Sequence, residues 1–213
     1  MKSSKQKLSF EELAWLADYD VIIGVDEVGR GALAGPLYAS AVAIKREDYE
    51  NWLVYGPVIR DSKKMTSHAR EEGCLWISGQ SLIIETAWVN PQEIDSHGIS
   101  WANTDAMQRA VDGCRAHIDP KCRVKIVSDH VVLSTLDAFE SFPRAESRSF
   151  AVACASVWAK EQRDSYMKKL TISLPDYGWE THVGYGTLKH REAIMKYGPT
   201  PEHRMSFIKN YLD

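Results

Sequence analysis

The chain has 213 residues, of which 44% are hydrophobic and 26% are charged, and its formal net charge at pH 7 is −3. This composition is typical of a globular protein, and no apolar run approaches the roughly 20 residues that a membrane span requires. It therefore excludes a membrane-spanning chain. Met1 to Gln6 is polar and basic but is not followed by an apolar run, so we expect no secretory signal and a cytoplasmic protein.

Cysteine spacing and charge distribution limit the remaining classes. The four cysteines show no paired C-x-x-C spacing, and we expect four reduced thiols: Cys74, Cys114, Cys122 and Cys154. Residues 144–213 carry a net charge of +3, whereas residues 1–143 carry −6. The imbalance fits charges on solvated faces, and it also fits phosphate contacts concentrated at the C-terminal end.

The first half of the chain predicts two helices and three strands. Phe10 to Leu16 has the spacing of a short amphipathic helix, and Val21 to Val25 is a β-branched run typical of a buried strand. A short glycine-rich connection leads to Leu37 to Ile44, which we expect to pair antiparallel with it. Thr66 to Trp76 is predicted to be a helix, and Leu82 to Val89 a third strand.

Helices dominate the second half. Ile99 to His117 has helical spacing and is followed by a short strand, Val124 to Val127. Strand, helix and strand together predict a right-handed crossover with parallel pairing of the two strands. Ser149 to Leu170 is predicted to be a long helix closed by Pro175, and Thr187 to Tyr197 a further helix. We therefore expect an α/β domain over residues 1–170 and a helical extension over residues 171–213.

Two adjacent carboxylates follow the first predicted strand. Asp26 and Glu27 lie at its carboxyl end, where α/β sheets tend to place their sites. A divalent cation bridging the two would relieve the repulsion between their charges. A solvated strand end is the alternative for this pair alone.

Further acids lie at the ends of other elements. Asp129 ends a second predicted strand in the same manner, and Asp164 lies on the long helix. Carboxylates converging from separate elements suit Mg²⁺ or Mn²⁺, and there is no Cys/His cluster to indicate zinc. Two such ions can activate water and stabilise a leaving oxygen in phosphodiester hydrolysis. Taken alone, Asp164 beside Arg163 also fits a surface ion pair.

Three segments have the character of substrate contacts. In Gly29-Arg30-Gly31 two glycines allow the backbone to approach a ligand with its amides exposed, although many ordinary turns share this pattern. Ser62 and Lys63, in Asp61-Ser62-Lys63-Lys64, lie where a lysine could contact phosphate, or in a solvated loop. Tyr185, between two glycines, could stack on a sugar or base, or simply pack against protein.

Several segments, spread along nearly the whole chain, together resemble a known protein family. The segments are Gly24-Val25-Asp26-Glu27-Val28-Gly29-Arg30-Gly31, Leu33-Ala34-Gly35-Pro36, Asp61-Ser62-Lys63-Lys64-Met65, Ala102-Asn103 through Arg109-Ala110-Val111, Ala153 to Asp164, Gly184-Tyr185-Gly186-Thr187, and Tyr197-Gly198-Pro199-Thr200-Pro201 with His203-Arg204. Together they resemble the ribonuclease HII family from about Val21 to Phe207. The resemblance implies a ribonuclease-H-like mixed β-sheet flanked by helices, with a C-terminal helical extension.

The resemblance also implies an activity and its residues. Asp26, Glu27, Asp129 and Asp164 would be the catalytic acids and would hold two divalent ions, Mg²⁺ or Mn²⁺. Gly29, Arg30 and Gly31 would read the 2′-hydroxyl that distinguishes RNA from DNA, with Tyr185 packing nearby. The implied reaction is hydrolysis of the RNA strand of RNA–DNA hybrids and cutting 5′ of single ribonucleotides in duplex DNA, giving 3′-hydroxyl and 5′-phosphate ends.

The chain departs from the family pattern at three places. His130 stands where Gly is usual after the third acid, and Val28 replaces a frequent Ala. Ala145-Glu146-Ser147-Arg148-Ser149 stands where Gly-Asp-x-Lys-Ser is common, so Arg148 would supply a basic substrate contact in place of Lys. The related HIII type has Gly-Thr-Gly where this chain has Gly29-Arg30-Gly31, which favours HII.

Two other functions fit parts of the pattern. A junction-resolving nuclease with a ribonuclease-H-like sheet would use similar acids, and a catalytically silent module would bind hybrids without cutting them. The partners we expect are RNA–DNA hybrids and ribonucleotide-containing duplex DNA, with no membrane. We expect a monomer. No replication-clamp motif is evident in Ser206 to Asp213, and recruitment by a clamp is left open.

Overall fold

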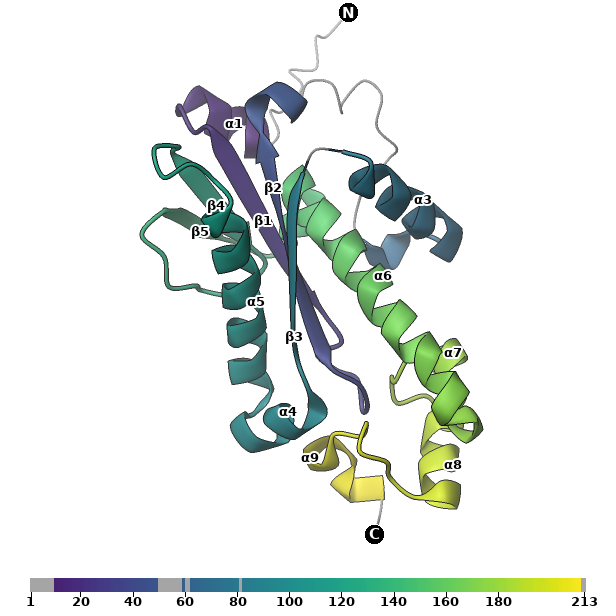
Figure 1. The fold of residues 1–213 in the computed structure, drawn as a ribbon. Coiled ribbons are helices and arrows are strands. Elements are labelled where there is room, and N and C mark those ends of the chain that lie inside the picture. The colour runs from purple at the N-terminus through teal and green to yellow at the C-terminus, as the bar shows by residue number, and fades with distance from the viewer. Residues whose placement is uncertain (1–9, 50–58, 60–61, 81, 212–213) are drawn as a thin grey trace, which may run out of the picture.

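The computed structural model describes residues 10–49, 59, 62–80 and 82–211. The expectation for Met1 to Gln6 and Asp61 of the predicted lysine motif lie outside these residues, as does Asp213. A five-stranded mixed sheet forms the centre, with the strand order β3-β2-β1-β4-β5. In Figure 1 this sheet lies between helix α5 (Ile99–Ala116) and helix α6 (Phe150–Ser173).

The central strand is β1, Val21–Val28. It pairs antiparallel with β2, Leu37–Lys45, which pairs antiparallel with β3, Ile83–Val89. On its other side β1 pairs parallel with β4, Val124–Ser128, which pairs parallel with β5, Ala138–Ser141. The predicted antiparallel pair is therefore confirmed, and β1 continues three residues beyond its predicted end.

The strand after α5 runs parallel, as the predicted crossover requires, but it pairs with a different strand from the one predicted. β4 follows α5 and lies parallel, but it pairs with β1, since β2 and β1 separate it from β3 in the sheet. β5 was not predicted, because it has only four residues and none of them is fully buried, so its apolar pattern is weak.

The remaining elements are helical. They are α1 (Phe10–Leu16), α3 (Ser67–Ser78), α4 (Pro91–His97), α7 (Trp179–His182), α8 (Leu188–Tyr197) and α9 (Met205–Ile208), with single 3₁₀ turns η1 (Ser62–Lys64), η2 (Ala145–Ser147), η3 (Pro175–Tyr177) and η4 (Lys209–Tyr211). Helix α4 was not predicted, although its start carries a clear signal. Asn90 and Glu93 form a reciprocal capping box, and Pro91 occupies the first turn.

Alternating side chains of the sheet build two apolar layers. Ile23 and Val25 of β1 belong to the layer beneath α5, whereas Ile22 packs on the other face with α6. The period of two along a strand explains this division. Asp26 follows the same alternation and therefore points to the face that carries α6.

Helix α6 lies unusually close to β1 because residue 24 is glycine. A Cβ atom on Gly24 would lie 2.3 Å from the backbone C of Ala151 and 2.3 Å from the backbone N of Val152. The start of α6 is held by Ser149, whose Oγ accepts from the amide of Val152, and by Glu11, whose Oε1 accepts from the amide of Ala151. Any side chain at position 24 would displace the helix.

The C-terminal segment is helical, as expected, and joins the glycine-rich segment after β1. Ala34 and His203 form an isolated antiparallel bridge, and the amide of Arg204 donates to the Leu33 carbonyl. α6 continues to Ser173, past the predicted division at residue 170, which stays a prediction. Among the residues described, no helix has the length and apolar character needed to cross a bilayer.

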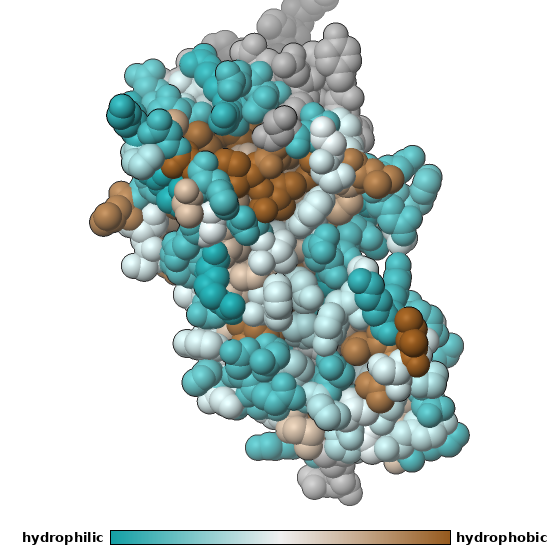
Figure 2. All heavy atoms as spheres, viewed as in Figure 1, coloured by the Kyte–Doolittle hydropathy of each residue, from teal (hydrophilic) through white to brown (hydrophobic). Residues whose placement is uncertain are grey.

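The cysteines and the surface have the properties expected of a globular protein with free thiols. All four cysteines are unpaired. Hydrophilic residues cover most of the face in Figure 2, with one broader hydrophobic area in its upper half. Large apolar side chains that are strongly exposed include Val132, Leu136 and Ile172. Exposed apolar residues of this kind are usual on soluble domains.

Candidate active site

Three acids lie at the same edge of the sheet. Asp26 and Glu27 are consecutive residues inside β1, and Val25 pairs with Ser128 of the parallel strand β4, so Asp129 follows at the same edge. Burial, together with the charge of Glu27, raises the pKa of Asp26 to about 8, against a hydrogen bond from Ser156 and the charge of Lys63. Burial also raises the pKa of Glu27; Arg30 opposes this shift and Asp129 adds to it.

These acids have the chemistry of a site for a hard cation. Within the described residues, neither Asp26 nor Glu27 forms an ion pair, and burial outweighs the opposing effect of nearby cations, Lys63 on both pKa values and Arg30 on that of Glu27. In the same part of the chain no three His, Cys, Asp or Glu side chains lie close enough together to form a ready-made metal site. Carboxylate oxygens without an ion-pair partner are the kind of donor that Mg²⁺ or Mn²⁺ prefers.

Asp129 is held by the loop that follows β5. Its Oδ1 accepts from the backbone N of Arg144 at 3.0 Å and lies 3.8 Å from Nε2 of His130. His130 has a φ of 55°, in the left-handed region that favours glycine. The departure from Gly at this position therefore places a side chain on a backbone that disfavours it.

A cavity of about 500 Å³ opens beside the acids. It is lined by Glu27, Val28, Gly29, Arg30, Gly31, Ser62, Lys63, Ser156, Lys160 and Tyr185. The structure thus brings one predicted acid together with six of the seven predicted substrate-binding residues. These residues come from β1, the turn after it, η1, α6 and the segment before α8, so tertiary structure alone assembles the cavity.

The glycine turn is fixed by contacts on its inner side. Gly29 has a φ of +90°, and a Cβ atom there would lie 2.2 Å from Nε of Arg163. Farther along, the amides of Leu33 and Ala34 donate to the Gly184 carbonyl at 2.9 and 3.3 Å. The segment that follows the turn is therefore bonded directly to the residue next to Tyr185.

Tyr185 lies close to two cations. The Lys160 ammonium is 5.7 Å and the Arg163 guanidinium carbon 5.4 Å from the centroid of its ring. Its carbonyl accepts a hydrogen bond from Nδ1 of His190 at 3.0 Å. The Tyr185 side chain is half-buried, and it lines the cavity.

Asp164 differs from the expectation for a metal ligand. Its Oδ1 accepts from Nζ of Lys160 at 2.7 Å, and its Oδ2 lies 3.8 Å from Nη2 of Arg70. Both carboxylate oxygens are therefore engaged by cations, in a side chain that is nearly buried. Asp164 contacts the cavity through Lys160, which lines it.

Arg148 does not lie where a residue that contacts the substrate was expected. Its guanidinium carbon lies 4.0 Å from the centroid of the Phe142 ring, and it is absent from the described lining of the cavity. The structure does not bring it together with the glycine turn.

Three residues of interest were missed from the sequence. Ser156 links Ser62, at 2.8 Å between hydroxyl oxygens, to Asp26, and Lys160 follows it by four positions on the same helix face. Glu146 lies in η2, two residues after the Arg144 that donates to Asp129. A signal existed for Glu146, because it stands at the acid of the Gly-Asp-x-Lys-Ser pattern.

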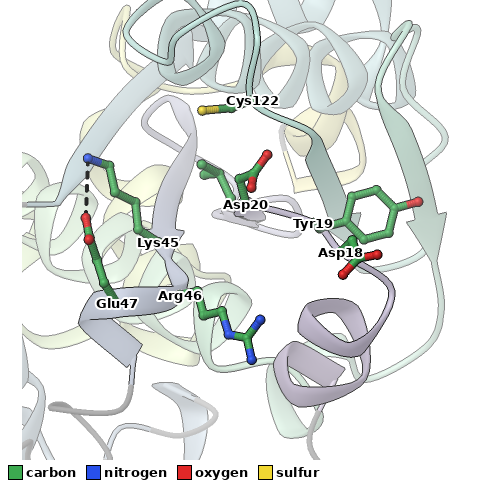
Figure 3. A pocket seen from close by; sticks show the side chains of 8 residues that line it. Asp18, Tyr19, Asp20, Lys45, Arg46, Glu47 and Cys122 are labelled. Atoms are coloured by element: carbon green, nitrogen blue, oxygen red, sulfur yellow. Dashed lines mark ion pairs between the residues drawn. The ribbon is translucent and has the colours of Figure 1, made fainter.

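A larger hollow, of about 610 Å³, lies at the opposite end of β1 and is drawn in Figure 3. Side chains of both signs line it, among them Asp18, Asp20, Lys45 and Arg46. Lys45 pairs with Glu47 at 3.9 Å, and Asp20 accepts from the amide of Arg123. Its charges are thus partly balanced locally, which contrasts with the acids at the other end of the sheet.

Comparisons with known proteins agree on one family. The sequence model described as ribonuclease HII matches residues 23–210. Ribonuclease HII of Clostridium botulinum is 39% identical over 90% of this chain and 69% of its own. Among solved structures, ribonuclease H2 of Pyrococcus horikoshii superposes with a TM-score of 0.73 at 23% identity, covering 90% of this chain and 96% of its own.

A second solved structure, Bst-RNase HIII in complex with Mn²⁺, superposes with a TM-score of 0.71 at 18% identity, covering 99% of this chain and 75% of its own. These likenesses show the ribonuclease-H-like fold, and the sequence matches go further. The chain belongs to the ribonuclease HII family of endoribonucleases.

Proposed function

We propose that this ribonuclease HII, an endoribonuclease acting on RNA–DNA hybrids, hydrolyses the phosphodiester on the 5′ side of a ribonucleotide, including a single one within duplex DNA. The products would carry 3′-hydroxyl and 5′-phosphate ends. One observation carries the proposal: a single cavity joins Glu27 of the acidic cluster to the Gly29–Gly31 turn and to Tyr185. Recognition of a ribose and cleavage of its phosphodiester can therefore occur side by side.

The metal requirement follows from the acids. We propose that Asp26, Glu27 and Asp129 hold two divalent ions, Mg²⁺ or Mn²⁺. When bound, such ions activate water and stabilise the leaving oxygen. The Mn²⁺ complex of Bst-RNase HIII, which has the same fold, supports a divalent ion. Ser156, hydrogen bonded to both Ser62 and Asp26, would hold the Asp26 carboxylate in place.

Two residues are candidates for a fourth acid. Asp164, expected from the family resemblance, is engaged by Lys160 and Arg70 and would act by holding Lys160 at the cavity unless a metal displaces these cations. Glu146 is the second candidate, because its segment is hydrogen bonded to Asp129 through Arg144.

The cations of the cavity suit the nucleic-acid backbone. Arg30, Lys63 and Lys160 line it, and their charges would bind phosphates on either side of the cleaved bond. A Cβ atom on Gly31 would have no neighbour within 4 Å, so the backbone of the turn can approach a ribose on that side and donate to its 2′-hydroxyl. Arg148, over Phe142, would contact substrate only if it left that ring. We also propose that the enzyme acts as a monomer and is cytoplasmic.

The test is cleavage of a labelled DNA duplex containing one ribonucleotide, with Mg²⁺, Mn²⁺ or EDTA. A matched duplex without the ribonucleotide is the control, and a continuous RNA–DNA hybrid and a branched all-DNA junction are parallel substrates. We expect a cut 5′ of the ribonucleotide that EDTA abolishes. Binding to the hybrid without cleavage would indicate a silent binding module, and cutting of the DNA junction a resolving nuclease. A 3′-phosphate or a 2′,3′-cyclic phosphate would contradict the proposed chemistry.

A further inference from the structure

Arg163 is a buried cation with an uncommon set of partners. It lies on α6 with no exposed surface, and its three donor nitrogens reach three backbone carbonyls. Nε donates to Pro36 at 3.0 Å, Nη2 to Ala34 at 3.0 Å and Nη1 to Val183 at 2.8 Å. Two of these carbonyls belong to the segment that follows the glycine turn, and the third lies two residues before Tyr185.

The same side chain touches both recognition elements. Its Nε would lie 2.2 Å, and its Cδ 2.8 Å, from a Cβ atom on Gly29, so the arginine stem forms the floor beneath the turn. Its guanidinium carbon lies 5.4 Å from the centroid of the Tyr185 ring, a cation–π contact. Arg163 is thus in contact with the first glycine of the turn and with the aromatic ring across the cavity.

Hydrogen-bond geometry, and not an ion pair, holds the Arg163 guanidinium in the interior. Burying a charge is costly unless it is paired, and Arg163 forms no carboxylate ion pair within the described residues. Asp164, the next residue, directs its oxygens to Lys160 and Arg70 instead. The planar fork of a guanidinium donates to several acceptors in fixed directions, which a lysine cannot reproduce. Its geometry, more than its charge alone, suits the three carbonyls.

We propose that Arg163 is a positioning residue that holds the Gly29–Gly31 turn and the Tyr185 ring at a fixed separation, so that an isolated ribonucleotide is recognised by both. The inference rests on the proposed function. A continuous RNA strand offers a 2′-hydroxyl on every nucleotide and can bind in several registers. A single ribonucleotide offers one, so it depends more strongly on that separation.

Arg204 holds the same turn from another side. It is also fully buried; its Nη1 donates to the Arg30 carbonyl at 3.1 Å, and its Nε and Nη2 to the Gly35 carbonyl at 3.0 and 2.8 Å. Its cation–π contact is with Phe207, at 5.3 Å, and not with Tyr185. Arg204 therefore supports the turn, whereas Arg163 connects the turn to the ring.

The experiment compares Arg163→Lys and Arg163→Gln with the wild type on two substrates, the duplex with one ribonucleotide and the continuous hybrid. The quantity measured is the ratio of the two kcat/KM values. Loss of folded enzyme lowers both rates equally and leaves the ratio unchanged, so a partly unfolded variant still gives a result. Arg115→Lys is the matched control, because Arg115 lies on α5, outside the cavity, and pairs there with Asp137.

We expect the ratio to fall at least fivefold in Arg163→Lys and to stay unchanged in Arg115→Lys. In a Tyr185→Ala background, Arg163→Lys should change the ratio much less, because the ring that it positions is gone. A ratio that stays at the wild-type value in both Arg163 variants would overturn the positioning role. If the wild type itself cuts neither substrate, the proposed function fails, which is a separate outcome.

Discussion

His190 and His203 share a hydrogen bond in the protein interior, with 3.2 Å between their Nε2 atoms. His203 Nδ1 accepts from the amide of Thr200 at 2.9 Å, so the proton of His203 lies on Nε2 and is donated to His190. His190 in turn donates from Nδ1 to the Tyr185 carbonyl. The bonding pattern requires both rings to be neutral, and burial lowers the pKa of each to about 4.

Acid should therefore weaken the fold through these rings. Between pH 6.5 and 4 the unfolded chain binds protons that the folded chain does not, so stability is lost as the pH falls through this window, by up to about 3 kcal/mol for one ring. Urea unfolding of the wild type and of His203→Gln, which keeps a donor near the Nε2 position, measures the difference. The variant should lose less stability between pH 7 and 4, because acids such as Asp26 contribute equally to both proteins. Identical pH dependence in the two would contradict this account.

Removing one charge from the acidic pair should abolish turnover and leave the fold intact. We expect Asp26→Asn to lower kcat by at least about 1,000-fold, because it removes charge from the proposed metal site with little change in shape. In EDTA its melting temperature should equal or exceed that of the wild type, since the cost of burying a charged Asp26 carboxylate beside Glu27 is removed. Asp18→Asn, in the hollow of Figure 3, is the control and should retain activity. Near-normal cleavage by Asp26→Asn would contradict the assignment.

The two candidates for the fourth acid can be separated by their demand for metal. If Asp164 acts by holding Lys160, then Asp164→Asn should raise KM several-fold and leave the Mg²⁺ concentration for half-maximal rate unchanged. Glu146→Gln should raise that concentration if Glu146 helps to hold an ion. The measurement is a Mg²⁺ titration of single-turnover rates. A higher Mg²⁺ demand in Asp164→Asn alone would return Asp164 to the role of metal ligand.

Loss of the Tyr185 ring should affect recognition more than stability. Stacking of an aromatic ring on a base or sugar is worth about 1–3 kcal/mol, so we expect Tyr185→Ala to reduce cleavage at a single ribonucleotide by roughly tenfold to a hundredfold. Tyr185→Phe keeps the aromatic ring near Lys160 and Arg163 and should retain most of the rate. An unchanged rate in Tyr185→Ala would leave the residue only a packing role.

Backbone strain at His130 should be measurable. Its φ of 55° favours glycine, so His130→Gly is expected to increase the free energy of unfolding by about 0.5–1 kcal/mol. Val132→Gly, at an exposed residue outside the left-handed region, should instead lower it slightly. Thermal unfolding of the three proteins measures this difference. Loss of stability in His130→Gly would mean that the contact of His130 with Asp129 outweighs the strain.

The sequence predicted those elements that depend on local hydrophobic patterns. The alternating and β-branched runs identified β1, β2 and β3, and the acids at strand ends indicated where the sheet carries its chemistry. Strand β5 was not predicted because its four residues, three half-buried and one exposed, show too little apolar alternation, and α4 was not predicted although its start carries a capping box. The partners of Asp164 and Arg148 depend on side chains from distant elements, Arg70 and Phe142, and spacing along the chain does not encode those contacts.

Gly24 determines how constant the distance between the strand and helix residues of the site remains. Because it brings the backbone of β1 against that of α6, the distance between Asp26, two residues farther along the strand, and Ser156, one turn farther along the helix, depends on contact between main chains. Main-chain contact cannot be lengthened or shortened by changing a rotamer. The spacing of the acids should therefore tolerate extensive repacking of the surrounding apolar residues, and even one methyl group at position 24 would disturb it.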